Sequence, residues 1–162
     1  MTDKRKTYTQ ALNRVASYCS KAERCCWDVM QRLQKYELSS TEKEEIVDWL
    51  VKENFLSEER YAKAFVNDKV RFSRWGRLKI RQGLIQKKIP NHLIDEALSV
   101  IDEQVYVENL LVLANKKRKE LEGEESYMLQ NKLIKYLGSR GFLYPEIEKL
   151  LSKNGLIPDN IW

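Results

Sequence analysis

The chain has 162 residues and a formal net charge of +5, with 33% charged and 43% hydrophobic residues, six glycines and three prolines. The length allows one core, or a few small units that share one, and it excludes a large multidomain enzyme. The composition fits a helical protein rather than a disordered or β-rich one. No segment approaches the roughly 20 consecutive apolar residues of a membrane span. The basic N-terminal residues precede no apolar run, so we expect a cytoplasmic protein with no membrane-bound part.

Signals for helix starts recur along the chain. Thr41 followed by Glu44 has the spacing of a capping box. Ser57 before two glutamates and Ser126 after a Gly-Glu-Glu loop are N-cap candidates, and Pro145 suits a first helical turn. No stretch shows the alternation of a strand. The sequence predicts helices over residues 7–19, 22–36, 42–53, 58–72, 76–88, 92–103, 104–120, 127–139 and 145–153.

Large apolar residues recur with similar spacing in three parts of the chain. In each part, a leucine is followed five residues later by another large apolar residue and then by an apolar triad at helical spacing. The pairs are Leu33 and Leu38, Leu84 and Ile89, and Leu137 and Phe142; the triads are Ile46, Trp49 and Leu50, then Ile94, Ala97 and Leu98, then Ile147, Leu150 and Leu151. The spacing predicts three tandem three-helix units, over residues 1–56, 57–103 and 104–162. Because short helices bury little apolar surface alone, we expect an all-α, elongated array of helix-turn-helix-like repeats.

Residue types that form catalytic and metal sites are few. Cys19, Cys25 and Cys26 are an odd number of thiols far from the single histidine, His92, so neither a disulfide framework nor zinc-ligand spacing is present. Cys19, Ala22 and Cys26 fall one turn apart on a helix, which favours thiols packed in a core. No glycine-rich phosphate loop occurs, and His92 stands at a predicted helix start. We therefore expect no catalytic residue, no metal and no cofactor.

Charge is distributed unevenly along the chain. The net charge is +5 over residues 1–36, −5 over 37–60, +7 over 67–90, −5 over 91–115 and +3 over 116–153. The basic band at 67–90 holds a single acidic residue, which predicts an anionic partner. Guanidinium groups bind phosphates and carboxylates alike, so DNA and an acidic protein surface both remain open. The candidate partner-binding residues are Arg71, Arg74, Arg77, Lys79, Arg81, Lys87 and Lys88.

Two aromatic residues stand among these basic side chains. Phe72 and Trp75 have the interleaved positions of base-stacking aromatics in proteins that bind single strands. Both also lie at a predicted helix junction, where a helical bundle needs large apolar side chains, and core packing is the favoured interpretation. A second basic run, residues 116–119, is followed at once by glutamates and is typical of a helix C-terminus.

The central segment carries a family resemblance. NFLSEERYAKAFVNDKVRFSRWGRLKIRQGLIQKKI, residues 54–89, resembles the signature segment of the RecX family, bacterial regulators of the RecA recombinase. The matching residues are Phe55, Leu56, Glu59, Arg60, Tyr61, Ala62, Phe65, Val66, Arg71, Gly76, Ile80, Leu84 and Ile89. Asn54 and Lys88 replace glycines of the family pattern and Ser57 replaces an acidic residue, whereas Gly141 keeps the glycine in the third unit.

The resemblance implies a non-enzymatic modulator of recombination and DNA repair. Such a protein sits in the groove of the RecA filament on DNA, contacts more than one protomer, and restrains ATP hydrolysis and strand exchange. The partner is then the RecA filament, with DNA bound weakly or within the filament, and the modulator is expected to be a monomer. The alternative is an independent helix-turn-helix-like DNA-binding protein, with the helix that begins near Gly76 on DNA.

Overall fold

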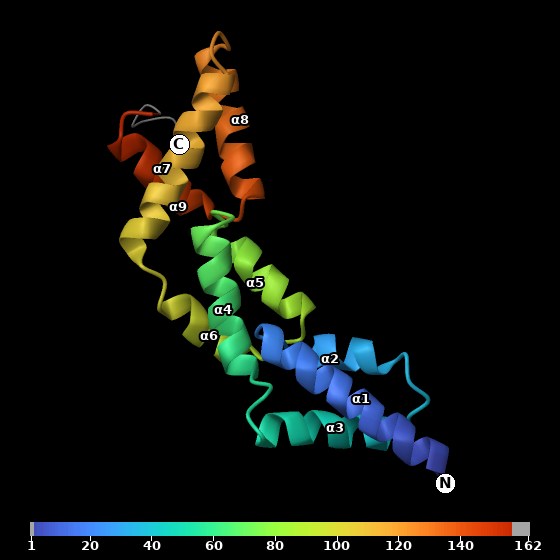
Figure 1. Ribbon diagram of the computed structural model, residues 1–162. Coiled ribbons are helices and arrows are strands. Elements are labelled where there is room, and N and C mark those ends of the chain that lie inside the picture. The colour runs from blue at the N-terminus through green and yellow to red at the C-terminus, as the bar shows by residue number, and fades with distance from the viewer. Residues whose placement is uncertain (1, 157–162) are drawn as a thin grey trace. The chain divides into compact units, whose positions relative to one another are not determined.

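The computed structural model describes residues 2–156. Over this range the chain forms nine α-helices and no strand (Figure 1). The helices are α1 (Thr2–Lys21), α2 (Cys26–Leu33), α3 (Ser40–Lys52), α4 (Glu58–Arg71), α5 (Arg77–Gln86), α6 (Asn91–Ser99), α7 (Glu103–Glu120), α8 (Ser126–Ser139) and α9 (Tyr144–Lys153). The predicted all-α class is therefore confirmed, and every predicted helix has a counterpart.

Two of the four predicted helix-start signals are confirmed by the structure and two are wrong. Ser57 caps α4, because its Oγ accepts from the Arg60 N–H at 3.2 Å. Pro145 lies in the first turn of α9 as predicted. The capping box of α3 was predicted two residues too late, since it joins Ser39 and Glu42 through two hydrogen bonds of 3.1 Å. Ser126 caps nothing, because it is already the first residue of α8.

The prediction of one helix over residues 22–36 was wrong at its start. Cys25 has extended backbone angles and is the N-cap of α2, with its Sγ accepting from the Asp28 N–H at 3.5 Å. The Cys26 N–H donates to Glu58 at 2.7 Å. A thiol is a poor capping group and the carboxylate comes from a distant helix, so local sequence did not reveal this start. The thiols still pack in the interior: Cys19 and Cys25 are buried and Cys26 is half-buried.

The described residues pack as two compact units. Unit 1 comprises the residues up to Ala64 together with Leu84–Ile94, and unit 2 comprises Phe65–Gly83 and the residues from Asp95 on. A core in unit 1 is formed by side chains of α1, α2 and α3 and of the loop after α3: Ala11, Val15, Cys19, Val29, Leu33, Ile46, Leu50 and Leu56. A core in unit 2 is formed by side chains of α7, α8 and α9 and of the turn between α8 and α9: Tyr106, Leu110, Leu113, Ala114, Leu133, Leu137, Phe142, Ile147 and Leu151. The division into three repeats at residues 56/57 and 103/104 stays a prediction.

The apolar positions that predicted the repetition are mostly buried. Both members of the second and third pairs and the whole second triad are inaccessible to solvent or nearly so. Leu38 and Leu150 are half-buried. Trp49 is 39% exposed, and its ring stacks on Phe55 at the surface of unit 1, with ring centroids 5.6 Å apart. Its place in the first triad was therefore wrong.

Several helices end on a residue in the left-handed region. Lys88 has φ 60° and Asn54 has φ 65°, at two positions where the family pattern favours glycine, and Gly141 has φ 98°. After α5 the Ile89 N–H donates to the Leu84 carbonyl at 3.2 Å, which closes the helix end as in a Schellman motif. The turn at Lys88 thus forms without glycine, at the steric cost of a Cβ in this conformation.

No helix within residues 2–156 combines the length and the apolar composition needed to cross a lipid bilayer. In the same range, no cluster of three or more His, Cys, Asp or Glu side chains is placed to hold a metal ion.

Candidate anion-binding surface

The loop between α4 and α5 holds its tryptophan in place. The Trp75 N–H donates to the Lys69 carbonyl at 3.0 Å, and the ring meets Phe65 edge-on at 6.4 Å between centroids. The ammonium groups of Lys69 and Lys79 lie 4.4 Å and 4.5 Å from the same ring centroid. Trp75 is thus a packed junction residue, as predicted. Phe72 is not, because 75% of it is exposed, with the Arg71 guanidinium 5.7 Å from its ring centroid.

The first turn of α5 is anchored within unit 2. The Gly76 N–H donates to the Arg140 carbonyl at 2.8 Å and the Leu78 N–H donates to the Gly141 carbonyl at 3.0 Å. Between them, the Arg77 N–H donates to the Tyr106 hydroxyl at 3.1 Å. A helix N-terminus attracts anions through its unpaired N–H groups. Because these N–H groups already have partners, the start of α5 does not offer an anion site.

The side chain of Arg77 is tied into the same unit. Its guanidinium forms ion pairs with Glu103 and, at 3.2 Å, with Glu146, and it lies 4.1 Å from the Tyr106 ring centroid. The Tyr106 hydroxyl in turn donates to Glu146 at 3.0 Å. Burial raises the pKa of Tyr106, and the neighbouring Glu146 carboxylate acts in the same direction. The Arg77 side chain is 26% exposed, and its charge is balanced by two carboxylates, of which Glu146 is sheltered and Glu103 is exposed.

Arg81 and Lys87 also have carboxylate partners. Arg81 pairs with Asp95 at 2.6 Å, with both side chains well exposed. Lys87 pairs with Asp28 at 2.8 Å in unit 1, and its ammonium lies 4.7 Å from the Trp27 ring centroid. The hydrogen bond to Asp28 raises the pKa of Lys87, although partial burial opposes the shift. Only 15% of the Asp28 side chain is exposed, which makes this pair the more sheltered of the two.

The seven candidate residues therefore fall into two groups. Arg77, Arg81 and Lys87 pair with carboxylates, whereas Arg71, Arg74, Lys79 and Lys88 have no carboxylate partner in the described part of the chain. Arg71 and Arg74 are exposed on the end of α4 and the following loop, and Lys88 is exposed at the end of α5. Lys87 and Lys88 belong to unit 1 and the other five residues to unit 2. The basic band thus contains fewer available charges than its sequence suggests.

Sequence reasoning missed the acidic partners because they are distant along the chain. Glu103 and Glu146 follow Arg77 by 26 and 69 residues, and Asp28 precedes Lys87 by 59 residues. The negative net charge of residues 91–115 was a sequence signal for Glu103, but the sequence marked neither of the other two carboxylates as a partner. A count of charges by segment does not show which of them pair.

The chain is similar to known proteins over most of its length. Residues 57–98 match the second three-helix domain of RecX and residues 104–151 match its third three-helix domain. A Clostridium botulinum protein named regulatory protein RecX is 40% identical over 109 residues, which cover 66% of this chain and 50% of that protein. The Clostridium acetobutylicum protein of the same name is 30% identical over 150 residues, which cover 90% of this chain and 69% of that protein.

Solved structures show the same fold. The crystal structure of RecX from Lactobacillus salivarius superposes with a TM-score of 0.84 at 23% identity, covering 94% of this chain and 99% of that chain. A second crystal structure of a regulatory protein RecX gives a TM-score of 0.82 at 24% identity. The chain spans about half the length of the Clostridium botulinum relative, so the activity and partners of whole relatives do not transfer to it directly.

Proposed function

This chain belongs to the RecX family of regulatory proteins, and from that premise we propose that it binds a RecA-type recombinase filament on DNA and restrains its ATP hydrolysis and strand exchange. The match of residues 57–98 and 104–151 to the second and third three-helix domains of the family carries the proposal. The protein acts in this role as a non-enzymatic modulator, in the cytoplasm and as a monomer.

The thiols support a non-enzymatic role. Burial raises the pKa of both Cys25 and Cys26 to about 12, with the nearby Glu58 carboxylate adding to the effect at Cys26. Because the thiolate is the reactive form, both groups stay protonated and unreactive at physiological pH.

The partner surface we propose centres on the cations without a carboxylate partner. In unit 2, Arg71 and Arg74 are exposed and can meet acidic protein surface or DNA phosphates in the filament, while half-buried Lys79 lies over the Trp75 ring. Lys88 is an exposed cation of unit 1 and is a separate candidate contact. Arg77, Arg81 and Lys87 also belong to the basic band, but they already form ion pairs with carboxylates of the chain, so they contribute mainly to the fold. Exposed Phe72 adds an apolar group beside Arg71.

The arrangement of α5 favours this role over that of an independent helix-turn-helix reader. A recognition helix presents its N-terminal residues to base edges in the major groove. Here the N-terminal N–H groups of α5 donate within unit 2, and Arg77 is held by Glu103 and Glu146. A contact through the exposed loop before α5 requires none of these groups to be released.

The test is ATP hydrolysis by recombinase filaments assembled on single-stranded DNA. We expect the protein to slow ATP turnover at stoichiometric amounts, and no change at that ratio would contradict the proposal. Arg71→Glu with Arg74→Glu should raise the concentration needed for half-maximal effect by about tenfold, because two exposed contact charges are reversed. The matched control is Lys135→Glu with Lys149→Glu, which reverses two exposed charges of α8 and α9 in the same unit and should leave the effect unchanged.

A further inference from the structure

A second basic surface lies in unit 1, outside the band at residues 67–90. Side chains of α1 and α2 and of the segments that follow each helix line a cavity of about 610 Å³. Its charged lining consists of Arg14, Lys21, Arg24, Arg32 and Lys35, without a carboxylate. We call these five residues the N-terminal basic groove. A solvated protein surface usually mixes both signs of charge, so a lining of one sign is a signal for an anionic ligand.

Two of the guanidinium groups are preorganised on one tyrosine. The guanidinium carbons of Arg24 and Arg32 lie 3.9 Å and 3.7 Å from the centroid of the Tyr18 ring. The Nε of Arg24 also donates to the Tyr18 carbonyl at 3.2 Å. Side chains held in this way lose less conformational entropy when they bind a ligand.

The charge of the groove is not balanced within the described residues. The acidic residues nearest in sequence are engaged elsewhere in unit 1, Glu23 with Arg60 at 3.0 Å and Asp28 with Lys87 at 2.8 Å. None of the five groove cations has an ion-pair partner among residues 2–156. The excess of positive charge over residues 1–36 in the sequence is thus concentrated on this surface.

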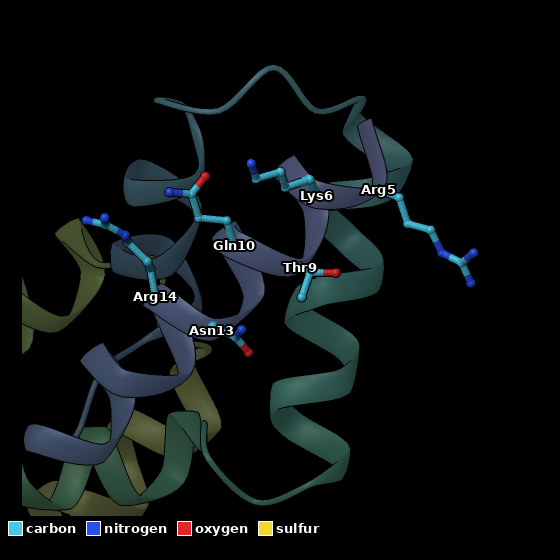
Figure 2. Close-up of a pocket in the computed structure, with 6 residues that line it drawn as sticks. All are labelled: Arg5, Lys6, Thr9, Gln10, Asn13 and Arg14. Carbon is cyan, nitrogen blue, oxygen red and sulfur yellow. The ribbon is translucent and has the colours of Figure 1, made fainter. Parts of the chain in front are cut away.

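The basic surface continues along α1 toward the N-terminus. A neighbouring open surface region shares Asn13 and Arg14 with the groove and is also lined by Arg5, Lys6, Thr9 and Gln10, all from α1. Figure 2 shows these six side chains on α1, with Arg5 and Arg14 extending in opposite directions. No acidic residue lines this region either. Hydroxyl and amide groups beside arginines are typical of contacts to phosphate and sugar.

The length of the basic surface along α1 favours a nucleic-acid strand as the ligand over a compact anion. From Lys6 to Lys21, α1 extends about 22 Å at 1.5 Å per residue, which is about six to seven phosphate steps of 3.4 Å along one strand of a duplex. The guanidiniums occupy the Tyr18 ring, so this ring is not available for base stacking. Contacts of cations and small polar groups without stacking bind the backbone and not the base sequence.

We propose that the N-terminal basic groove and the adjoining face of α1 bind the phosphate backbone of a nucleic-acid strand, without sequence preference. This goes beyond the proposed function, because it concerns residues 5–35 of unit 1 and requires no recombinase. The site gives the chain a contact to nucleic acid that is separate from the Arg71 to Lys88 band.

The test is direct binding of the purified full-length chain to a fluorescent 30-nucleotide single strand, over a series of salt concentrations. The groove variant combines Arg14→Ala, Lys21→Ala and Lys35→Ala, three exposed side chains without an ion-pair partner in the described range. We expect its affinity to fall at least about tenfold and the slope of log K against log salt to fall by about 2, since each lost phosphate contact removes about 0.7 from the slope for a single strand.

The matched control removes three other exposed lysine charges, by Lys52→Ala, Lys135→Ala and Lys149→Ala. It should keep the affinity within about twofold of the parent, because these lysines lie outside the groove. Circular dichroism establishes that both variants are folded. Equal affinity and slope in the parent and the groove variant would overturn the proposal.

A poly-glutamate peptide of equal charge distinguishes nucleic acid from an acidic protein partner. Weaker binding of the peptide than of the oligonucleotide supports the proposal. Equal binding of the peptide, with the same loss in the groove variant, would overturn it in favour of an acidic protein ligand. Neither result depends on recombinase ATPase, so failure here and failure of the proposed function are separate outcomes.

Discussion

The backbones of Gly76 and Gly141 are in direct contact in unit 2. A Cβ atom on Gly76 would overlap the carbonyl group of Gly141, and a Cβ atom on Gly141 would overlap the side chain of Lys79. The Gly141 carbonyl accepts from the Leu78 N–H at 3.0 Å. This contact joins the start of α5, within the basic band, to the turn between α8 and α9. It explains in physical terms why glycine stands at residue 76, which is also a residue of the family pattern.

Gly76→Ala should destabilise the protein by about 2 to 3 kcal/mol, because the added methyl group has no space and the backbone must shift. The measurement is urea unfolding followed by circular dichroism. Gly138→Ala is the matched control, since it is exposed in α8 and no neighbouring atom lies within 4 Å of the position that its added methyl group would take. It should raise stability by about 0.5 to 1 kcal/mol through helix propensity. A Gly76→Ala protein as stable as the parent would contradict the close contact.

Arg77→Ala should cost about 1 to 3 kcal/mol of stability, because it leaves Glu146 and the Tyr106 hydroxyl without their cation and removes packing on the Tyr106 ring. Arg81→Ala removes a pair with Asp95 that is largely exposed and should cost less than about 1 kcal/mol. Thermal or urea unfolding of the two variants side by side gives the comparison. Equal losses at the two positions would show that Arg77 has no special structural role.

The helices were predictable because their signals are local. Apolar residues at helical spacing and the cap at Ser57 lie within a few residues of the structure they specify, and the structure has them as predicted. The start of α2 was not predictable in this way, since Cys25 is its cap and Glu58, 32 residues later than Cys26, accepts from its first turn.

The candidate site was predictable only in part, for a related reason. The sequence shows how many cations a segment carries, but the partner of each cation is decided by the fold. Arg77 and Arg81 were equal members of the candidate set in the sequence, yet Arg77 contacts two carboxylates and a tyrosine while Arg81 contacts one exposed carboxylate. Phe72 and Trp75 also looked alike, and the structure exposes the first and packs the second.

Lys88→Gly should stabilise the protein by about 0.5 to 1 kcal/mol, because Lys88 has φ 60° and glycine adopts the left-handed region without a Cβ clash. The free energy of unfolding from urea titration measures the effect. Lys88→Ala is the control: it removes the same charge but keeps a Cβ, so its stability should stay near that of the parent. If both variants gain stability equally, charge and not backbone conformation is responsible. If both variants bind the recombinase filament more weakly than the parent and equally to each other, the loss of affinity is due to the missing ammonium group of Lys88.

The buried thiols predict a contribution to stability that is lost only at alkaline pH. Burial raises the pKa of Cys25 and Cys26 from an ordinary value near 9 to about 12. The folded state therefore favours the protonated thiols, and this contribution to stability is complete below pH 9 and is lost as the pH rises from 9 toward 12. Urea unfolding at a series of pH values should show it, and Cys26→Ala should reduce the decline. A decline that begins below about pH 8 would need another titrating group.

The same shift predicts slow alkylation of the native protein at about pH 8. The thiolate is the reacting species, and a pKa near 12 lowers its fraction about a thousandfold relative to a free thiol, so iodoacetamide should modify Cys25 and Cys26 at least about 100-fold more slowly in the folded chain than in guanidinium. Mass spectrometry of tryptic peptides measures both rates. Ser126→Cys places a thiol at an exposed helix start and serves as the control that reacts fast in the folded state. If Cys25 and Cys26 react as fast as that control, the thiols are open to solvent, and the non-enzymatic role loses one of its supports.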